Sequence, residues 1–231
     1  MVEMSHATHT ACVSLVPIFN HLDLESMNKI AAKAKHRDLE RGEYLYQAGD
    51  EEDSIYIVHK GQLRVYHLSE AGKEQLIRVL NPGEFTGEWT LFSSNTFHEN
   101  FGEATRKTAI CEISRQDLEG LLKDYPEISM KILQAMSERL SQSEKQTASV
   151  ATESVINRII YYLEDLTAGE IEDDVTIRLP MARKDIASYL GTTPETLSRR
   201  FKELENKGLI EPLPKNTIRI PSVEELLFAT E

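Results

Sequence analysis

The sequence predicts an α+β protein in three parts: an N-terminal antiparallel β-roll, a long dimerisation helix and a C-terminal winged helix-turn-helix. Three observations predict this fold class. Short strand-like runs separated by turn residues fill residues 37–113, a spacing typical of antiparallel rolls and barrels. A long helical pattern follows, and two short amphipathic helices around Gly191 precede a hairpin pattern. We place the boundaries at 1–125, 126–152 and 153–231.

Composition limits the classes of protein that this chain can be. It has 231 residues, 40% apolar and 28% charged, with a net charge of −12. No apolar run is long enough to cross a membrane, and the N-terminus has no secretory pattern. We therefore expect a cytoplasmic protein with reduced cysteines that does not bind membranes.

The charge is unevenly distributed along the chain. Residues 181–220 carry eight Lys or Arg and five Asp or Glu, so this segment has a net charge of +3 and the remainder −15. A modestly basic module on an acidic body indicates local contact with DNA rather than general binding of nucleic acids.

The N-terminal part is expected to contain two helices around the strands. Roughly residues 23–35 form a short helix with an apolar face that includes Leu24 and Ile30, and residues 114–122 form a second. The strand-like runs are 44–46, 54–58, 62–66 and 75–80, separated mainly by glycine-containing turns.

The helical pattern beyond Pro126 runs to about residue 168, and it weakens only at residues 141–149. One of its faces has the spacing of a coiled-coil seam with a polar centre. This seam could pair two copies of the chain as a weak, adjustable homodimer, or it could pack only on the chain's own roll. Its residues are Leu133, Met136, Leu140, Ser143, Thr147 and Val150.

The second helix of the helix-turn-helix has two different faces. Thr193 is a good N-cap and Pro194 suits the first position, while Leu197, Phe201 and Leu204 form a core-facing stripe. Beyond Gly208, residues 209–212 and 217–220 form the hairpin of the wing.

The opposite face of that helix carries Glu195, Ser198 and Arg199, which are suited to reading bases. Arg can contact guanine with two hydrogen bonds, and Glu can accept from the cytosine amino group. Three flanking residues could hold phosphates, and they are Thr193, Arg200 and Lys202. The alternative is a solvated helix in which Glu195 and Arg199 form an ordinary ion pair.

Several motifs, in order along nearly the whole chain, resemble the CRP/FNR family of transcription regulators. They are the glycine-punctuated runs 42–50, 55–66 and 81–89 and the helix-turn-helix run 179–199. The resemblance implies a homodimer paired along the long helix that binds double-stranded DNA as an inverted repeat and contacts RNA polymerase.

The residues of the reading helix match the FNR-type branch of that family. Glu195, Ser198 and Arg199 fall on its Glu-x-x-Ser-Arg triplet, and Pro194 stands where the CRP branch has an arginine. The resemblance therefore implies a TTGA–N6–TCAA site rather than a TGTGA site.

The cyclic-nucleotide pocket of the CRP branch is only partly matched. Gly87 and Glu88 resemble its ribose-binding pair, but His98 and Glu99 stand where an Arg-Ser pair would hold the cyclic phosphate. A carboxylate repels a phosphate, so no cAMP is expected. A structural role in the roll accounts better for Gly87 and Glu88.

The two cysteines, Cys12 and Cys111, match two of the cluster-ligating cysteines of FNR, and the other two are missing. A four-iron cluster needs four ligands, which disfavours an iron–sulfur cofactor. The pair resembles the FLP-type, FNR-like regulators of Gram-positive bacteria, which implies a Cys12–Cys111 dithiol–disulfide redox switch.

Other interpretations of these cysteines stay open. Cys111 could be a buried core residue and Cys12 incidental. His6, His9, Cys12 and Cys111 could instead form a tetrahedral zinc site, and a small molecule could bind in the roll.

An enzyme is not expected. The sequence has no glycine-rich phosphate loop, no GxSxG motif and no HExxH motif, and its carboxylates lack the spacing of a paired acid and base.

Overall fold

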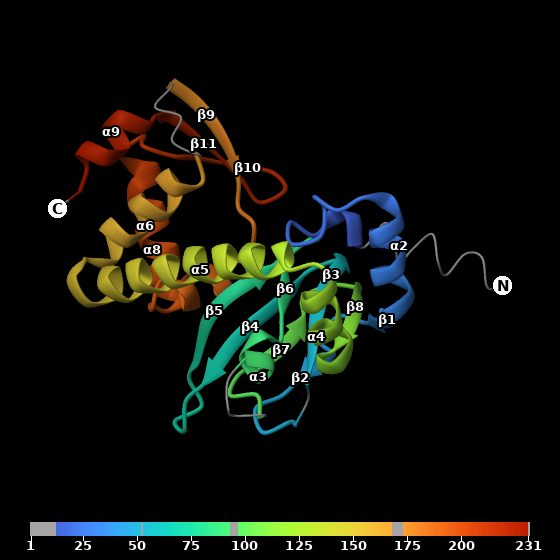
Figure 1. The fold of residues 1–231 in the computed structure, drawn as a ribbon. Helices are drawn as coiled ribbons and strands as arrows, with labels where there is room; N and C mark the ends of the chain where they lie inside the picture. Colours follow the sequence, from blue (N-terminus) through green and yellow to red (C-terminus); the bar gives the residue numbers. More distant parts are fainter. Residues whose placement is uncertain (1–12, 52, 93–96, 168–172, 231) are drawn as a thin grey trace. The chain divides into compact units, whose positions relative to one another are not determined.

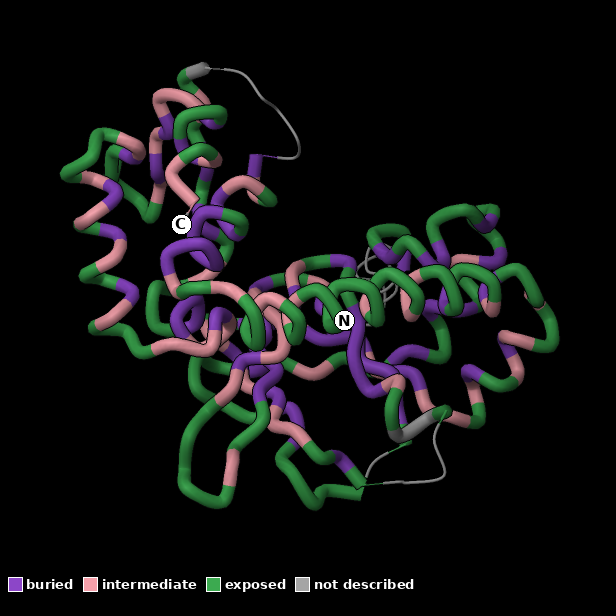
Figure 2. The backbone as a smooth tube through the Cα atoms, turned by 90° about the vertical axis from the view of Figure 1, so that its left-hand side faces the viewer, coloured by how far each residue is buried: buried purple, intermediate pink, exposed green. Residues whose placement is uncertain are grey.

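The computed structural model describes residues 13–51, 53–92, 97–167 and 173–230 (Figure 1). The chain divides into two compact units, Met1–Leu140 and Ser141–Glu231. The division falls inside the long helix, so the three-part boundaries stay a prediction. Along the backbone, core residues are buried and the tips of the long hairpin loops are exposed (Figure 2). No helix in the described part of the chain is long and apolar enough to cross a membrane.

The N-terminal unit is an antiparallel roll of two four-stranded sheets. The first sheet has the order β1 (Lys35–Leu39), β8 (Thr108–Ser114), β3 (Ser54–Lys60) and β6 (Phe85–Thr86). The second has the order β2 (Tyr44–Tyr46), β7 (Phe101–Ala104), β4 (Leu63–Leu68) and β5 (Glu74–Leu80). The roll and the four predicted strands are confirmed, and β1, β6, β7 and β8 complete it.

Short helices accompany the roll in the described part of the chain, among them α2 (Leu24–Lys33), α3 (Glu88–Phe92) and α4 (Arg115–Asp124). The first helix starts close to its predicted position: Asp23 is its N-cap and accepts from the Ser26 amide at 2.9 Å. Ser114 likewise caps α4 through the Asp117 amide at 3.2 Å. The first helix ends earlier than predicted, since Ala34 is extended and leads directly into β1.

The long helix α5 (Glu127–Thr152) is continuous, so the predicted weakening of the helix at residues 141–149 is wrong. The helical pattern breaks instead at Glu153–Ser154. Ser154 has extended backbone angles and caps the next helix, α6 (Val155–Asp165), by accepting from the Asn157 amide. A serine at this position offers the amides of a new helix a partner, which favours a new start over continuation.

The C-terminal unit packs α6, α7 (Arg183–Tyr189), α8 (Pro194–Asn206) and α9 (Val223–Phe228) around one core with a small sheet. The predicted hairpin of the wing is present as β10 (Glu211–Leu213) and β11 (Thr217–Ser222). A third strand, β9 (Asp173–Arg178), pairs with β11. The sequence did not predict β9, because it begins with two aspartates, a residue type that is depleted in strands.

Candidate nucleic-acid interface and regulatory core

The helix α8 is held by its apolar stripe and its cap. Leu197, Phe201 and Leu204 are all buried in the core of the C-terminal unit. The Thr193 hydroxyl accepts from the Thr196 amide at 3.2 Å, and Pro194 occupies the first turn. Gly191 has a φ of +63°, which lets the chain turn sharply between α7 and α8. These local features confirm the predicted helix-turn-helix.

The predicted reading face of α8 is exposed to solvent. Glu195, Ser198 and Arg199 are all exposed, and within the described part of the chain no ion pair joins Glu195 to Arg199. Hydrogen bonds from its own backbone amide and from the Thr193 hydroxyl lower the pKa of Glu195, so it is a carboxylate at neutral pH. One acceptor and one guanidinium therefore project from the same face of the helix.

The flanking cations have carboxylate partners on the same helix. Arg200 Nη1 lies 2.7 Å from Glu203 Oε2, and Lys202 Nζ lies 3.0 Å from Glu205 Oε1. Both pairs have the i, i+3 spacing at which helical side chains meet. This spacing could have predicted the two ion pairs from the sequence. Their predicted role on the DNA backbone stays a prediction, as does that of Thr193.

The seam of α5 exposes large apolar side chains. Leu133 and Leu140 are each 61% exposed and Val150 is 41% exposed. Met136 is half-buried against the core of the roll, and the exposed Thr147 donates its hydroxyl to the Ser143 carbonyl at 2.9 Å. The helix thus uses one side for its own roll and leaves a second apolar stripe in solvent, as a helix with an external partner would.

Cys111 lies in the core of the roll, at the centre of strand β8. It is 1% exposed and faces His36 of β1 and Ile57 of β3 in the strand register. Its core cluster includes Val13 and Val16 from the start of the described chain, and Ile128 and Ile132 from α5. Cys111 is therefore placed where a change at its sulfur would affect both the N-terminal segment and the long helix.

Cys111 is disulfide-bonded, and no described cysteine has a free thiol. The second cysteine of the sequence, Cys12, lies outside the described residues, as do His6 and His9. Among the residues that are described, no group of three or more His, Cys, Asp or Glu side chains could hold a metal ion. The Cys12–Cys111 switch and the four-residue zinc site both stay predictions.

A cavity of about 220 Å³ lies in the roll beside Glu88 and Arg78. Arg78 Nη2 donates to Glu88 Oε1 at 2.5 Å, and Arg139 Nη1 of α5 lies 3.0 Å from the same oxygen. Gly87 is required here, because its φ is +92° and a Cβ would lie 2.2 Å from the Ser54 carbonyl oxygen. Sequence reasoning did not find this ion-pair network, since its members are far apart in the chain.

The other wall of this cavity is aromatic. His98 stacks on Tyr46 with ring centroids 3.8 Å apart, and Glu99 lies beside it. Burial lowers the pKa of His98 and raises that of Tyr46 to about 12, so both rings are neutral at neutral pH. The cavity therefore offers two carboxylates and one guanidinium, and that guanidinium is already bonded to Glu88. This charge balance does not favour a phosphate.

Comparison with known proteins matches both units. The protein-family model of the cyclic nucleotide-binding domain matches residues 36–125 of the sequence. The family model of the Crp-like helix-turn-helix domain matches residues 157–228. A probable transcriptional regulator, flp, of Lacticaseibacillus casei is 36% identical over 94% of this chain and 96% of its own. The transcriptional activator Anr of Pseudomonas protegens is 28% identical over 87% of this chain and 84% of its own.

Solved structures share the fold. FixK2 of Bradyrhizobium japonicum superposes with a TM-score of 0.72 at 23% identity, covering 86% of this chain and 98% of its own. CprK in complex with OCPA superposes with a TM-score of 0.73 at 20% identity, covering 93% of this chain and 99% of its own.

Proposed function

The chain belongs to the CRP/FNR family of DNA-binding transcription regulators, and we propose that it acts as a homodimer on an FNR-type inverted repeat, TTGA–N6–TCAA. The exposed triplet Glu195, Ser198 and Arg199 carries this proposal. Arg199 and Glu195 are one turn apart on α8, so together they can contact neighbouring base pairs in the major groove. The relatives flp and Anr are transcription regulators, and this chain is not an enzyme.

Pro194 supports the choice of half-site. It occupies the position before Glu195, where its ring has no donor for a guanine, and it is fixed in the first turn of α8. A second guanine-reading arginine, which a TGTGA half-site requires in the CRP branch, therefore has no counterpart on this helix. The partner that reads the second half-site is another copy of the chain, joined along the exposed stripe of α5.

A competition assay tests the site. Labelled TTGA–N6–TCAA duplex is bound to the full-length protein and displaced by unlabelled TTGA or TGTGA repeats at one salt concentration, because phosphate contacts make affinities salt-dependent. The TTGA repeat should compete better by about 10-fold or more, since each wrong base pair costs roughly 1–3 kcal/mol. Equal or better competition by the TGTGA repeat overturns this assignment.

We propose that a disulfide between Cys12 and Cys111 controls DNA binding. The support is the place of Cys111 in a core that joins the first described residues to α5. In the oxidation step, two thiols and one hydrogen peroxide give one S–S bond and two waters. Closing a loop of about 100 residues contributes up to about 4.7 kcal/mol in the chain-entropy model, which is enough to bias a dimer between two arrangements.

The redox proposal is tested on one preparation by DNA binding, intact mass and metal content. We expect oxidised protein to be lighter by two hydrogens, to yield a linked Cys12–Cys111 peptide, and to differ in DNA affinity from the reduced form. Cys12→Ser and Cys111→Ser should abolish that difference. If both variants respond to oxidant as the unmodified chain does, the switch is refuted. If Cys12→Ser instead releases bound zinc, the metal alternative replaces it.

One observation favours a small-molecule effector in the roll as a second candidate signal. Glu88 Oε2 is buried and has no hydrogen-bond partner among the described residues, although the carboxylate lines the cavity. An effector there would donate a hydrogen bond to Glu88, and the second carboxylate, Glu99, disfavours cAMP. Isothermal titration with cAMP should therefore detect no binding.

We also propose that the DNA-bound protein contacts RNA polymerase, and this part of the proposal follows from the family alone.

A further inference from the structure

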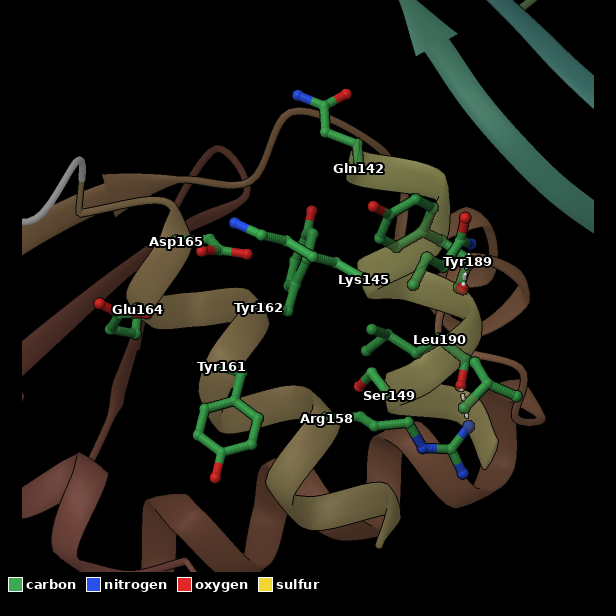
Figure 3. Close-up of a pocket in the computed structure, with 12 residues that line it drawn as sticks. Gln142, Lys145, Ser149, Arg158, Tyr161, Tyr162, Glu164, Asp165, Tyr189 and Leu190 are labelled. Carbon is green, nitrogen blue, oxygen red and sulfur yellow. Dashed lines mark hydrogen bonds between the residues drawn. The ribbon is translucent and has the colours of Figure 1, made fainter. Parts of the chain in front are cut away.

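A separate pocket of about 650 Å³ lies within the C-terminal unit, between the last turns of α5, the helix α6 and the end of α7 (Figure 3). Neither DNA reading nor the Cys111 core uses it. Figure 3 shows Lys145 from α5 and Tyr162 from α6 projecting into the space between these two helices, with Arg158 near Leu190.

Two polar side chains in this pocket each have a buried atom that lacks a hydrogen-bond partner among the described residues. Arg158 and Tyr162 are each 9% exposed. The Arg158 Nη1 donates to the Leu190 carbonyl oxygen, but Arg158 Nε and the Tyr162 hydroxyl have no hydrogen-bond partner among the described residues. Buried polar atoms in folded proteins nearly always have a partner. None of the described residues supplies that partner here, so a bound ligand could.

The charge of Arg158 determines what kind of ligand fits. Within the described part of the chain, Arg158 forms no ion pair, so a buried guanidinium has no carboxylate to balance it. Its planar fork of donors is suited to a carboxylate or phosphate group. Lys145 adds a second cation, while Glu164 and Asp165 line another side of the pocket and would repel a second anionic group.

The remaining walls are aromatic. The rings of Tyr162 and Tyr189 lie 6.0 Å apart at an angle of 54°, and Tyr161 also lines the pocket. Aromatic rings in this tilted arrangement pack favourably against a further planar ring. We propose that this pocket binds a small planar aromatic molecule with one anionic group, held by Arg158 and by a hydrogen bond from the Tyr162 hydroxyl.

Calorimetry on the full-length protein tests the proposal with two matched probes, para-hydroxybenzoate and para-hydroxybenzyl alcohol. The two differ only in whether the substituent is a carboxylate. We expect para-hydroxybenzoate to bind and the neutral alcohol to bind at least about 10-fold more weakly, because a charge-assisted bond to Arg158 is lost. Equal binding of the two probes, or no binding of either, overturns the proposal.

Tyr162→Phe separates a ligand-binding role from a structural one. It removes one unpartnered hydroxyl, so the unfolding temperature of the ligand-free protein should stay the same or rise, while affinity for para-hydroxybenzoate falls about fivefold. Tyr44→Phe is the control: it removes the same atom from a tyrosine of the roll that is 39% exposed and does not line the pocket, and it should leave the affinity unchanged. A lower unfolding temperature with unchanged affinity in Tyr162→Phe refutes the proposal.

A competing occupant is also distinguishable. Val150 of the α5 seam lines the same pocket, so a second copy of the chain could cover it. To test this, para-hydroxybenzoate is titrated into the protein at concentrations below and above that at which the dimer forms. Sedimentation of the same samples measures whether the protein is a monomer or a dimer. Binding should be the same in both regimes. If the dimer does not bind the probe, the second copy occupies the pocket and the ligand proposal is wrong.

Discussion

Adjacent arginines on α8 have different surroundings. Arg199 is exposed, and no ion pair involving it exists among the described residues. Arg200 is half-buried and bonded to Glu203, which also pairs with Lys207. A guanidinium that already has a carboxylate partner must give it up to contact DNA, so we predict that Arg199 rather than Arg200 reads a base.

Replacing Arg199 with alanine should cost about 1–3 kcal/mol of binding to the TTGA repeat and relax the preference at one base pair. Fluorescence anisotropy on the repeat and on its single-base variants measures both effects. Lys202→Ala serves as the contrast, because loss of a phosphate contact weakens binding to all sequences alike. Unchanged discrimination in Arg199→Ala would exclude this residue as a reader.

His98 makes stability depend on pH. Burial lowers its pKa in the folded protein, so below its unfolded value of about 6.5 the unfolded chain binds more protons than the folded one. The stabilisation is therefore complete above about pH 6.5 and is lost as the pH falls toward the folded pKa. Urea unfolding from about pH 7.5 to about pH 5.5 should show this slope, and His98→Gln should reduce it. His67→Gln, at an exposed position on β4, should leave it intact.

At the scale of the element, local sequence patterns predicted the helices and strands reliably, but they did not predict where the long helix ends. The core stripe and cap of α8 and the strands 44–46 and 75–80 were predicted because their signals lie within a few residues. The separation of α5 from α6 was missed, since the apolar pattern continues across Glu153–Ser154 and only the backbone of Ser154 marks the break.

The cap at the start of α6 is a direct test of that break. Ser154→Ala should lower the unfolding free energy by about 1 kcal/mol, because the Asn157 amide loses its acceptor. Ser154→Asp keeps an acceptor at the N-terminus of the helix and should retain the stability. Chemical denaturation followed by circular dichroism measures both variants. If alanine and aspartate behave alike, the hydroxyl has no capping role.

For the whole molecule, the central question is what covers the apolar stripe of α5. Leu133 and Leu140 are more than half exposed, whereas Ile128 and Ile132 on the same helix are buried in the roll. A second copy of α5 would remove the exposed leucines from water and bring two reading helices to the two half-sites of an inverted repeat.

Leu140→Ser should weaken the dimer without unfolding the monomer. Two leucines per dimer lose about 3 kcal/mol of burial together, which corresponds to roughly a 100-fold higher dissociation constant. Sedimentation velocity across a concentration series measures the shift, and affinity for the inverted repeat should fall with it. Leu24→Ser makes the same change at a 65% exposed leucine of α2 and should leave the dimer intact. An unaffected dimer in Leu140→Ser places the interface elsewhere.

The sequence by itself determined the fold class and the helix-turn-helix, and the base-reading role of its triplet stays a prediction. These depend on local spacing and on motifs that run in order along the chain. Only the tertiary structure decided that Arg78 and Arg139 hold Glu88 and that His98 stacks on Tyr46. It also decided that Arg158 Nε and the Tyr162 hydroxyl line one pocket with no hydrogen-bond partner among the described residues. The physical reason is that a side chain's charge balance and hydrogen bonds depend on neighbours from distant segments, which local periodicity does not record.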